Sequence, residues 1–171
     1  MLASPLVLAI ALVILLVSGR PPLIRHARVG WLGRPLLMFK FRTMWGSGVE
    51  APPVKCPDDP RITSRFARFC RRHSLDELPQ LIHVVRGEMS FVGPRPITAS
   101  ELDEYYGSAA EEVLSVRPGL TGLWQVRGRS RLSYARRRRL DQLLVRRGSS
   151  ALHFHILLCS IRDIFSGRDA W

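Results

Sequence analysis

Two neighbouring acidic residues, Asp76 and Glu77, have the type and spacing that chemistry on a phosphate requires. One carboxylate can attack phosphorus and form an acyl phosphate, and a second can hold a magnesium ion beside the substrate phosphates. Arg71 and Arg72 come shortly before the pair, and guanidinium groups neutralise charge on transferring phosphate oxygens. The pattern predicts a phosphoryl-transfer site with Asp76 as nucleophile and Glu77 as metal ligand.

The residues around the pair bear on where the next helix begins. Ser74 and Glu77 fit a capping box, a common motif that by itself has no catalytic meaning. Pro79 argues against that register, because it would be the fifth helical residue and its ring would clash with the preceding turn. With Asp76 as N-cap, Pro79 falls in the first turn, and the positive helix end keeps the Asp76 carboxylate ionised. This register favours attack by Asp76 over the reverse assignment, in which the longer Glu77 side chain attacks.

Other cations are expected near the same phosphate. Arg95 lies between Pro94 and Pro96, which restrict the backbone and hold the guanidinium in place. Lys40 and Arg42 share one face of a predicted strand, because side chains two residues apart point the same way. The alternatives are a solvated surface turn for Arg95 and the solvated side of a hairpin for Lys40 and Arg42.

Length and composition limit the class of protein. The chain has 171 residues, 26 basic against 14 acidic, and a formal net charge of +12. This is enough for one folded domain, and the charge favours an anionic partner: a phosphate-rich substrate, an anionic lipid surface or a nucleic acid. A GC-rich genome would also produce this arginine-rich composition. The three cysteines form no CxxC motif, so neither a disulfide framework nor a zinc site is expected, and a reducing cytosolic environment is favoured.

The first 17 residues are almost entirely apolar, interrupted only by Ser4 and Pro5. Three structures suit this run: a spanning helix, a helix that enters the membrane and returns, or a buried core helix. Arginines follow the run at positions 20, 25 and 28, which places that end on the cytoplasmic side. We expect residues 1–20 to be a membrane-associated helix and residues 21–171 to be a cytosolic catalytic domain.

The rest of the chain predicts a mostly helical α+β fold with one short β-hairpin. The hairpin is expected at 22–44 and a basic amphipathic helix at 62–73, with Ile62, Phe66 and Phe69 on its apolar stripe. A second helix is expected at 77–85, with Leu78, Leu81, Ile82 and Val85 on one side and Gly87 closing it. The remaining predictions are a mobile loop at 46–60, an acidic helical region at 100–114 broken at Gly107, a constrained loop at 118–122, and helices at 133–145 and 151–165.

These residues, in this order, resemble the bacterial sugar transferase family, the monotopic polyprenyl-phosphate phosphoglycosyl transferases. The resemblance covers the chain from about residue 2 to the C-terminus. Its most specific blocks are Lys40-Phe41-Arg42-Thr43-Met44, Ser74-Leu75-Asp76-Glu77-Leu78-Pro79-Gln80-Leu81, Gly87-Glu88-Met89-Ser90-Phe91-Val92-Gly93-Pro94-Arg95-Pro96 and Arg117-Pro118-Gly119-Leu120-Thr121-Gly122-Leu123-Trp124-Gln125-Val126. The last block resembles the branch that primes exopolysaccharide and capsule repeats with a hexose phosphate.

The resemblance implies transfer of a sugar 1-phosphate from a UDP-sugar to polyprenyl phosphate, with release of UMP. It implies that Asp76 is the nucleophile and forms a phosphosugar intermediate, and that Glu77 works with Mg²⁺. It also places Lys40, Arg42, Arg71 and Arg95 in or near the phosphate-binding site. The enzyme is then expected at the cytoplasmic face of the bacterial inner membrane, in contact with membrane lipids.

Ser4 and Pro5 also match the family, in which this pair breaks a helix that enters the membrane and returns to the same face. Pro5 removes one backbone hydrogen bond, which kinks a helix. The family usually has some ten to fifteen residues before the pair and this chain has three, so a shortened re-entrant helix is expected.

Two other functions remain open at this stage. A basic membrane-bound module would bind nucleic acid or anionic lipid with a steep salt dependence. The sequence has no helix-turn-helix, zinc-finger or aromatic RNA-binding signature, so no nucleic-acid partner is expected. A truncated or inactive paralogue would fold without seating its lipid substrate. Self-association into a homo-oligomer is compatible with the sequence.

Overall fold

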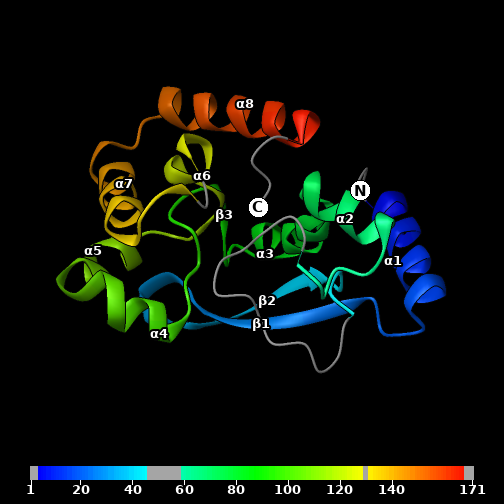
Figure 1. The fold of residues 1–171 in the computed structure, drawn as a ribbon. Coiled ribbons are helices and arrows are strands. Elements are labelled where there is room, and N and C mark those ends of the chain that lie inside the picture. Colours follow the sequence, from blue (N-terminus) through cyan, green and yellow to red (C-terminus); the bar gives the residue numbers. More distant parts are fainter. Residues whose placement is uncertain (1–3, 46–58, 129–130, 168–171) are drawn as a thin grey trace.

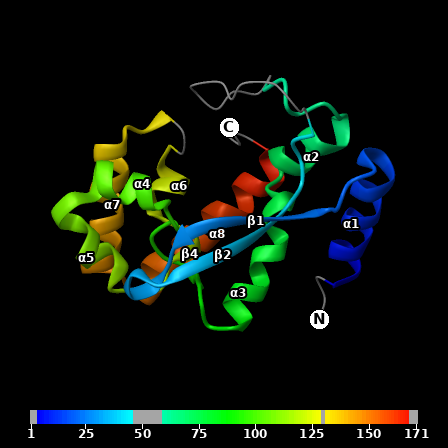
Figure 2. The same cartoon turned by 90° about the horizontal axis from the view of Figure 1, so that it is seen from below.

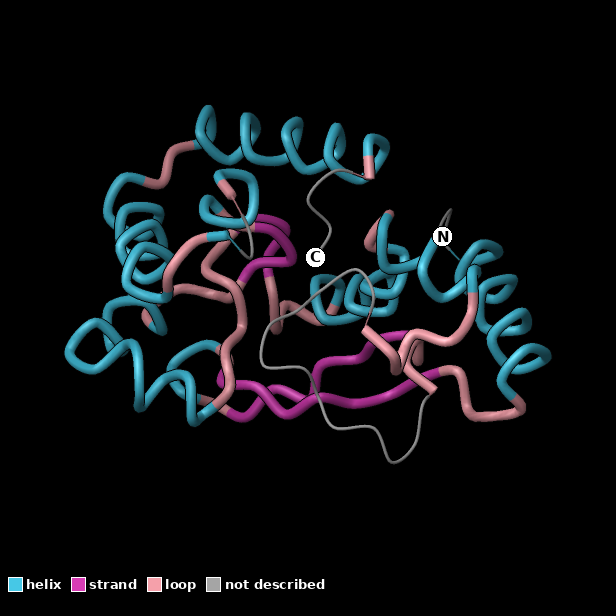
Figure 3. The backbone as a smooth tube through the Cα atoms, in the orientation of Figure 1, coloured by secondary structure: helices cyan, strands magenta, loops and turns pink. Residues whose placement is uncertain are grey.

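Helices make up most of the computed structural model, which describes residues 4–45, 59–128 and 131–167 (Figure 3). Two antiparallel strands and a second, parallel pair accompany them. The elements in order are α1 (Ser4–Ser18), β1 (Leu23–Val29), η1 (Trp31–Gly33), β2 (Pro35–Phe41), α2 (Arg65–Arg72), η2 (Leu75–Gln80), α3 (Leu81–Val85), β3 (Ser90–Val92), α4 (Ala99–Glu101), η3 (Leu102–Tyr106), η4 (Gly107–Ala109), α5 (Ala110–Leu114), β4 (Gly119–Thr121), α6 (Leu123–Arg127), α7 (Tyr134–Arg147) and α8 (Ser150–Ser166). The predicted mostly helical α+β class is confirmed.

The predicted β-hairpin is formed by β1 and β2, with Leu23 opposite Phe41 and Val29 opposite Pro35. It runs along one side of the molecule, and α8 lies on the opposite side with α3 between them (Figures 1 and 2). The far end of β1 is tied to the next part of the chain, because the Val29 amide donates to the Ile97 carbonyl at 2.8 Å. The hairpin therefore spans from α1 to the segment that follows Arg95.

The segment 118–122 differs from the predicted loop, because Gly119–Thr121 forms β4 and pairs in parallel with β3. The pairing depends on two glycines at which the backbones nearly touch. A Cβ on Gly119 would lie 2.1 Å from the Gly93 nitrogen, and a Cβ on Gly93 would lie 2.6 Å from the Arg117 carbonyl oxygen. Sequence reasoning identified the constraint but missed the strand, since a strand of three residues shows too little alternation to be recognised.

The N-terminal apolar run forms α1, which contributes one side to a core cluster. Ile10 and Ile14 are buried there beside Phe41 and Cys70. Six large apolar side chains on the rest of the helix are exposed: Leu6, Leu8, Leu12, Leu15, Leu16 and Val17. Among the described residues, no helix has both the length and the apolar character needed to cross a membrane. Pro5 lies in the first turn of α1, and because residues 1–3 lie outside the described ranges, the kink at Ser4 and Pro5 stays a prediction.

The basic helix α2 ends near His73 as predicted, and Phe66 of the predicted stripe packs against the core cluster that contains Cys70. Ala67 and Cys70 are the buried residues of α2, while Phe69 is exposed and Ile62 is buried just before the helix begins. Ser64 is the N-cap, and its side chain accepts a hydrogen bond from the Ala67 amide at 3.2 Å. Most of the loop predicted at 46–60 lies outside the described residues.

The helices predicted in the second half are confirmed as α7 and α8, and the break at Gly107 is confirmed by its positive φ of 47°. Leu144 and Ile156, one from each long helix, are buried together with Val92 and Leu123. The C-terminal end of α8 reaches back to the corner after α2, where His73 Nδ1 lies 2.6 Å from the Ile164 carbonyl oxygen. Helix α8 thus covers the parallel strand pair and contacts the segment that precedes the acidic pair.

Candidate functional site

The acidic pair lies in a tight 3₁₀ helix, η2, rather than in the predicted α-helix 77–85 with Asp76 as N-cap. Ser74 precedes η2 in a left-handed conformation, with φ 52° and ψ 22°, and its side chain makes no capping bond. Pro79 explains the change, because it has no N–H to donate and disfavours regular α geometry in the residues before it. The α-helix begins only at Leu81, and Gly87 follows it with φ +72° as predicted.

Glu77 is held by two cations that come from distant parts of the chain. Its Oε1 atom accepts from Lys40 Nζ at 2.6 Å and from Arg95 Nη2 at 3.2 Å. Burial raises the pKa of Glu77, but the charges and hydrogen bonds of Lys40 and Arg95 outweigh it and hold the pKa well below its usual range. Glu77 is therefore a fixed anion at neutral pH.

Asp76 has the opposite electrostatic setting. The residue is 8% exposed. Burial, followed by repulsion from Glu77, raises the pKa of Asp76 to about 6, while Lys40 and Arg71 oppose the rise. Asp76 is thus still mostly ionised at neutral pH, as expected, although its pKa is raised above its usual value. The carboxylate still ionises just below neutral pH, where it combines basicity with a negative charge.

Arg95 reaches Glu77 because hydrogen bonds fix the backbone just before it. The Gly93 amide donates to the Thr121 carbonyl at 3.0 Å, and the Gly119 amide donates to the Pro94 carbonyl at 2.8 Å. The parallel strand pair therefore positions the arginine. The prediction that Arg95 belongs to the site, rather than to a solvated turn, agrees with this geometry.

The other two cations of the predicted phosphate site are placed differently. Arg71 is close enough for its charge to lower the pKa of Asp76 and of Asp59. Arg42 follows the end of β2, and its Nε atom donates to the Pro21 carbonyl at 2.9 Å. The structure thus brings Lys40, Arg71 and Arg95 around the pair, while the phosphate-binding role of Arg42 stays a prediction.

Oxygen ligands for a magnesium ion are present in the two adjacent carboxylates. Magnesium is usually bound by one or two carboxylates together with substrate phosphates and water, so Asp76 and Glu77 fit this donor set. Within the described ranges, no three His, Cys, Asp or Glu residues are grouped to hold a metal ion.

Sequence reasoning missed several buried polar residues near the pair. Gln80 and His83 are 3% and 2% exposed, and with Asp76 they form the buried face of the η2–α3 segment. Their spacing in the sequence gives the signal, since positions four and seven residues after Asp76 share its helical face. A further buried acid, Asp141 on α7, accepts from the Tyr106 hydroxyl at 2.8 Å, and burial raises its pKa to about 7.

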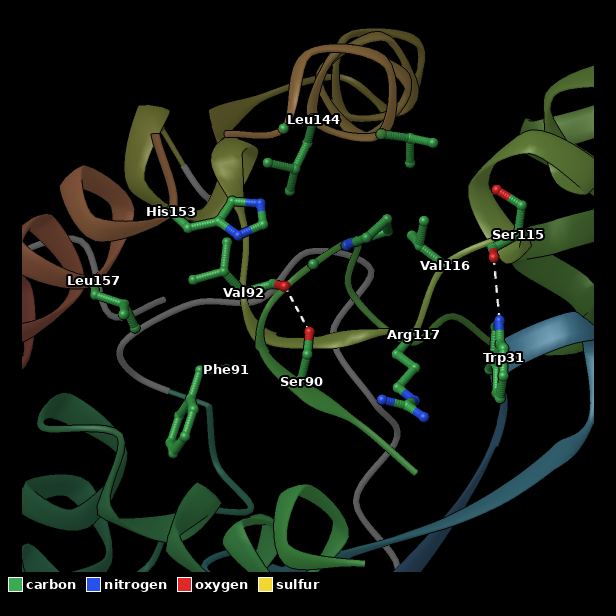
Figure 4. A pocket seen from close by; sticks show the side chains of 14 residues that line it. Trp31, Ser90, Phe91, Val92, Ser115, Val116, Arg117, Leu144, His153 and Leu157 are labelled. Atoms are coloured by element: carbon green, nitrogen blue, oxygen red, sulfur yellow. Dashed lines mark hydrogen bonds between the residues drawn. The ribbon is translucent and has the colours of Figure 1, made fainter. Parts of the chain in front are cut away.

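A separate cavity of about 620 Å³ lies beyond the Gly93–Pro94 turn (Figure 4). Trp31 and Arg117 line one side of it, and His153 and Leu157 of α8 line another. Pro94 lines the cavity, whereas Arg95 reaches Glu77 and neither acid of the pair is part of the wall. The cavity is therefore distinct from the acidic site.

The amino-acid sequence was compared with known protein families and with individual proteins. A sequence model of the family described as bacterial sugar transferase matches residues 1–167. The exopolysaccharide production protein ExoY of Rhizobium meliloti is 42% identical over 187 residues, covering 100% of this chain and 82% of ExoY. The UDP-glucose:undecaprenyl-phosphate glucose-1-phosphate transferase of Caulobacter vibrioides is 46% identical over 74% of this chain and 48% of that protein. The undecaprenyl-phosphate galactose phosphotransferase of Salmonella typhimurium is 40% identical over 75% of this chain and 30% of its own length. The chain therefore belongs to the bacterial sugar transferase family and is an enzyme of the sugar-phosphate transferase class.

Proposed function

We propose that the protein transfers a sugar 1-phosphate, a hexose 1-phosphate by the names of its relatives, from a UDP-sugar to undecaprenyl phosphate, as the first membrane step of exopolysaccharide synthesis. One observation carries the proposal: a buried carboxyl, Asp76, adjoins a carboxylate that Lys40 and Arg95 hold by ion pairs. The pair supplies a nucleophile with its charge-neutralising groups already in place.

The reaction proceeds by two displacements at one phosphorus atom. The Asp76 carboxylate attacks the phosphorus that bears the sugar, a new oxygen–phosphorus bond forms, and the bond to UMP breaks. UMP leaves with the bonding electrons, and Asp76 carries the sugar phosphate as an acyl phosphate. An oxygen of the lipid phosphate then attacks the same phosphorus, the bond to Asp76 breaks, and the free carboxylate returns.

The cationic residues around the acidic pair have different electrostatic roles. Lys40 and Arg95 keep Glu77 ionised, and Arg71 favours the ionised form of Asp76. These cations also neutralise charge on the transferring oxygens and on the leaving phosphate. Magnesium, held by Asp76 or Glu77 and the substrate phosphates, would supply further neutralisation at the diphosphate.

The second substrate is a membrane lipid, and the exposed apolar side chains of the protein suit that partner. Many of them lie on α1, on α3 and on α8, where Phe154, Leu158, Ile161 and Phe165 are exposed. In water such surface is costly, and at a bilayer surface it is buried. The protein would then work at the cytoplasmic face of the inner membrane, where it meets the UDP-sugar and the lipid phosphate together.

Mass spectrometry of the enzyme treated with donor alone tests the covalent step. Incubation with UDP-glucose or UDP-galactose and Mg²⁺ should release UMP and add the mass of a hexose phosphate to the peptide that contains Asp76. Asp76→Asn should abolish both signals, because the amide is a poor nucleophile. Glu77→Gln should slow them and weaken their response to Mg²⁺.

Two results would contradict the proposal. Full transfer by Asp76→Asn would show that Asp76 is not the nucleophile. Absence of UMP release from a panel of UDP-sugars with undecaprenyl phosphate would favour an inactive paralogue. A change at Arg146 is the matched control, because its ion pair with Glu112 involves no residue of the acidic site. Arg146→Gln should leave transfer unchanged.

A further inference from the structure

His83 makes two side-chain hydrogen bonds, and one of them links the acidic segment to the strand that bears Lys40. Its Nε2 atom lies 3.2 Å from the Phe39 backbone nitrogen, and its Nδ1 atom lies 2.5 Å from Glu88 Oε2. A backbone N–H can only donate, so Nε2 must be the acceptor and the proton of the neutral ring lies on Nδ1. The ring therefore donates to Glu88 and accepts from β2.

The Phe39 amide needs this acceptor because of its place in the hairpin. The Arg42 amide donates to the Pro22 carbonyl at 2.7 Å, and hydrogen-bonded pairs alternate along an antiparallel ladder. Lys40 therefore bonds across to β1, while Phe39, opposite Arg25, directs its N–H outward. In the part of the chain that the structure describes, this sheet has two strands, and no third strand there accepts from that N–H. His83 takes the place of a strand at this edge.

The ring itself is held in a fixed orientation. It stacks on the Phe39 ring with centroids 5.2 Å apart and planes 15° from parallel. The Arg25 guanidinium lies 5.5 Å from the centroid of the Phe39 ring. The His83 carbonyl accepts from the amides of Glu88 and Met89 at 2.9 and 3.1 Å. His83 is thus anchored on its own segment and presents one acceptor to the strand.

We infer that His83 is a positioning residue that sets Lys40 against Glu77 by fixing the edge of β2 at Phe39. Phe39 and Lys40 are neighbours, and each contacts the η2–α3 segment: Phe39 at His83 and Lys40 at Glu77. Two points of attachment fix both the distance and the angle between strand and segment. The inference rests on the proposed function only in assigning Lys40 and Glu77 to the transfer reaction.

The lysine content of the chain allows a direct measurement. Lys40 and Lys55 are the only lysines, so Lys55→Arg protein labelled with ¹³C,¹⁵N-lysine gives a single set of lysine side-chain signals, from Lys40. His83→Leu removes the acceptor, and the Lys40 signals should shift toward those of a solvated lysine. His83→Gln keeps an acceptor near the Nε2 position and should retain most of the native signal.

A matched control removes the side-chain hydrogen bonds of a residue that contacts neither His83 nor Lys40. Ser160 on α8 lies 2.6 Å from the Thr121 hydroxyl, and Ser160→Ala should leave the Lys40 signals unchanged. Native Lys40 signals in folded His83→Leu would overturn the inference. If His83→Leu does not fold, ¹⁵N spectra of histidine-labelled native protein decide the matter, with the His83 signals assigned by His83→Gln. A proton on Nε2 would overturn the inference, and a proton on Nδ1 supports it.

A double-mutant cycle gives the catalytic readout. His83→Leu alone should lower kcat about tenfold, the equivalent of one lost hydrogen bond of about 1.4 kcal/mol. In Lys40→Met protein the same change should have little further effect, because the group through which His83 acts is gone. Ser160→Ala and Lys40→Met should combine multiplicatively.

Multiplicative effects of His83→Leu and Lys40→Met would show that His83 only stabilises the fold. Absence of UMP release by the unmodified enzyme would remove the proposed function, but the Lys40 and histidine spectra would still test the positioning role.

Discussion

Asp76 and Glu77 are adjacent carboxylates whose surroundings move their pKa values in opposite directions. Glu77 meets Lys40 and Arg95 and stays ionised, whereas Asp76 is buried beside that negative charge and has a pKa of about 6. Divergent pKa values within one acidic pair are typical of sites that divide two chemical roles. Here the group with the raised pKa is the better base and nucleophile, and its neighbour is the permanent anion.

The raised pKa of Asp76 predicts a pH dependence for the first half-reaction. The carboxylate form attacks, so the rate of UMP release should increase with pH through about 6 and level off above it, with roughly a tenfold loss per unit below. Arg71→Gln removes a cation that lowers this pKa, so the midpoint should move to higher pH. Stopped-flow or quench measurement of UMP release checks both curves. An unchanged midpoint in Arg71→Gln would contradict the electrostatic role of Arg71.

Arg95 and Arg42 should differ in their effect on activity, although the sequence assigned both to phosphate binding. Arg95 donates to Glu77, while Arg42 donates to the Pro21 carbonyl. Arg95→Gln should lower kcat/KM about a hundredfold, the scale of losing one charge-stabilising donor. Arg42→Gln should cost less than about threefold, since it removes one exposed hydrogen bond worth a fraction of a kcal/mol. Equal losses in steady-state assays would support the predicted phosphate-binding role of Arg42.

At the scale of single elements, the prediction succeeds for the segments with a long and regular pattern. The β-hairpin and the long helices α7 and α8 were predicted from alternation and helical spacing. The η2–α3 segment does not follow the usual pattern: Asp76, Gln80 and His83 are buried, and Val85 is 83% exposed. Of the stripe predicted on Leu78, Leu81, Ile82 and Val85, Leu78 packs against a core cluster, whereas Ile82 and Val85 are exposed. A prediction from apolar periodicity assumes that apolar side chains face the core and polar side chains face water. A functional site that buries polar side chains does not follow this rule.

The parallel strand pair that positions Arg95 can be tested through its glycines. Gly119→Ala would place a Cβ 2.1 Å from the Gly93 nitrogen, so the strands must separate. We expect a loss of about 3 kcal/mol in the free energy of unfolding, together with reduced transfer. Gly33→Ala is the control, because no atom lies within 4 Å of the added carbon and only its φ of +75° opposes the change. Thermal unfolding that ranks the two variants equally would argue against strand separation.

Across the whole molecule, apolar side chains lie both in the cores and on the outside. On α1, Ile14 is fully buried beside Phe41, whereas Leu12 is 56% exposed. The sequence could not divide these roles, because almost every residue of the helix is apolar and no polar face marks its orientation. The interpretation of α1 as a buried core helix therefore holds for the side that carries Ile10 and Ile14. For its exposed apolar side, contact with the membrane is proposed.

Matched alanine variants on α1 separate the two roles. Leu12→Ala should weaken flotation with vesicles of bacterial phospholipid about tenfold, from the loss of apolar area at the bilayer, and leave thermal stability nearly unchanged. Ile14→Ala should cost about 2–5 kcal/mol of stability through the cavity it leaves. Unchanged flotation of Leu12→Ala would place the exposed side of α1 away from the membrane.

The ion pair of Lys40 with Glu77 also makes the enzyme open to covalent control. Acylation of the Lys40 amine would erase its positive charge, leave Glu77 with Arg95 alone, and add bulk beside Asp76. In a chain whose basic residues are almost all arginine, amine-directed reagents have few other side chains to modify. A reactive ester attached to a sugar-nucleotide mimic would thus find its target amine beside the nucleophile itself.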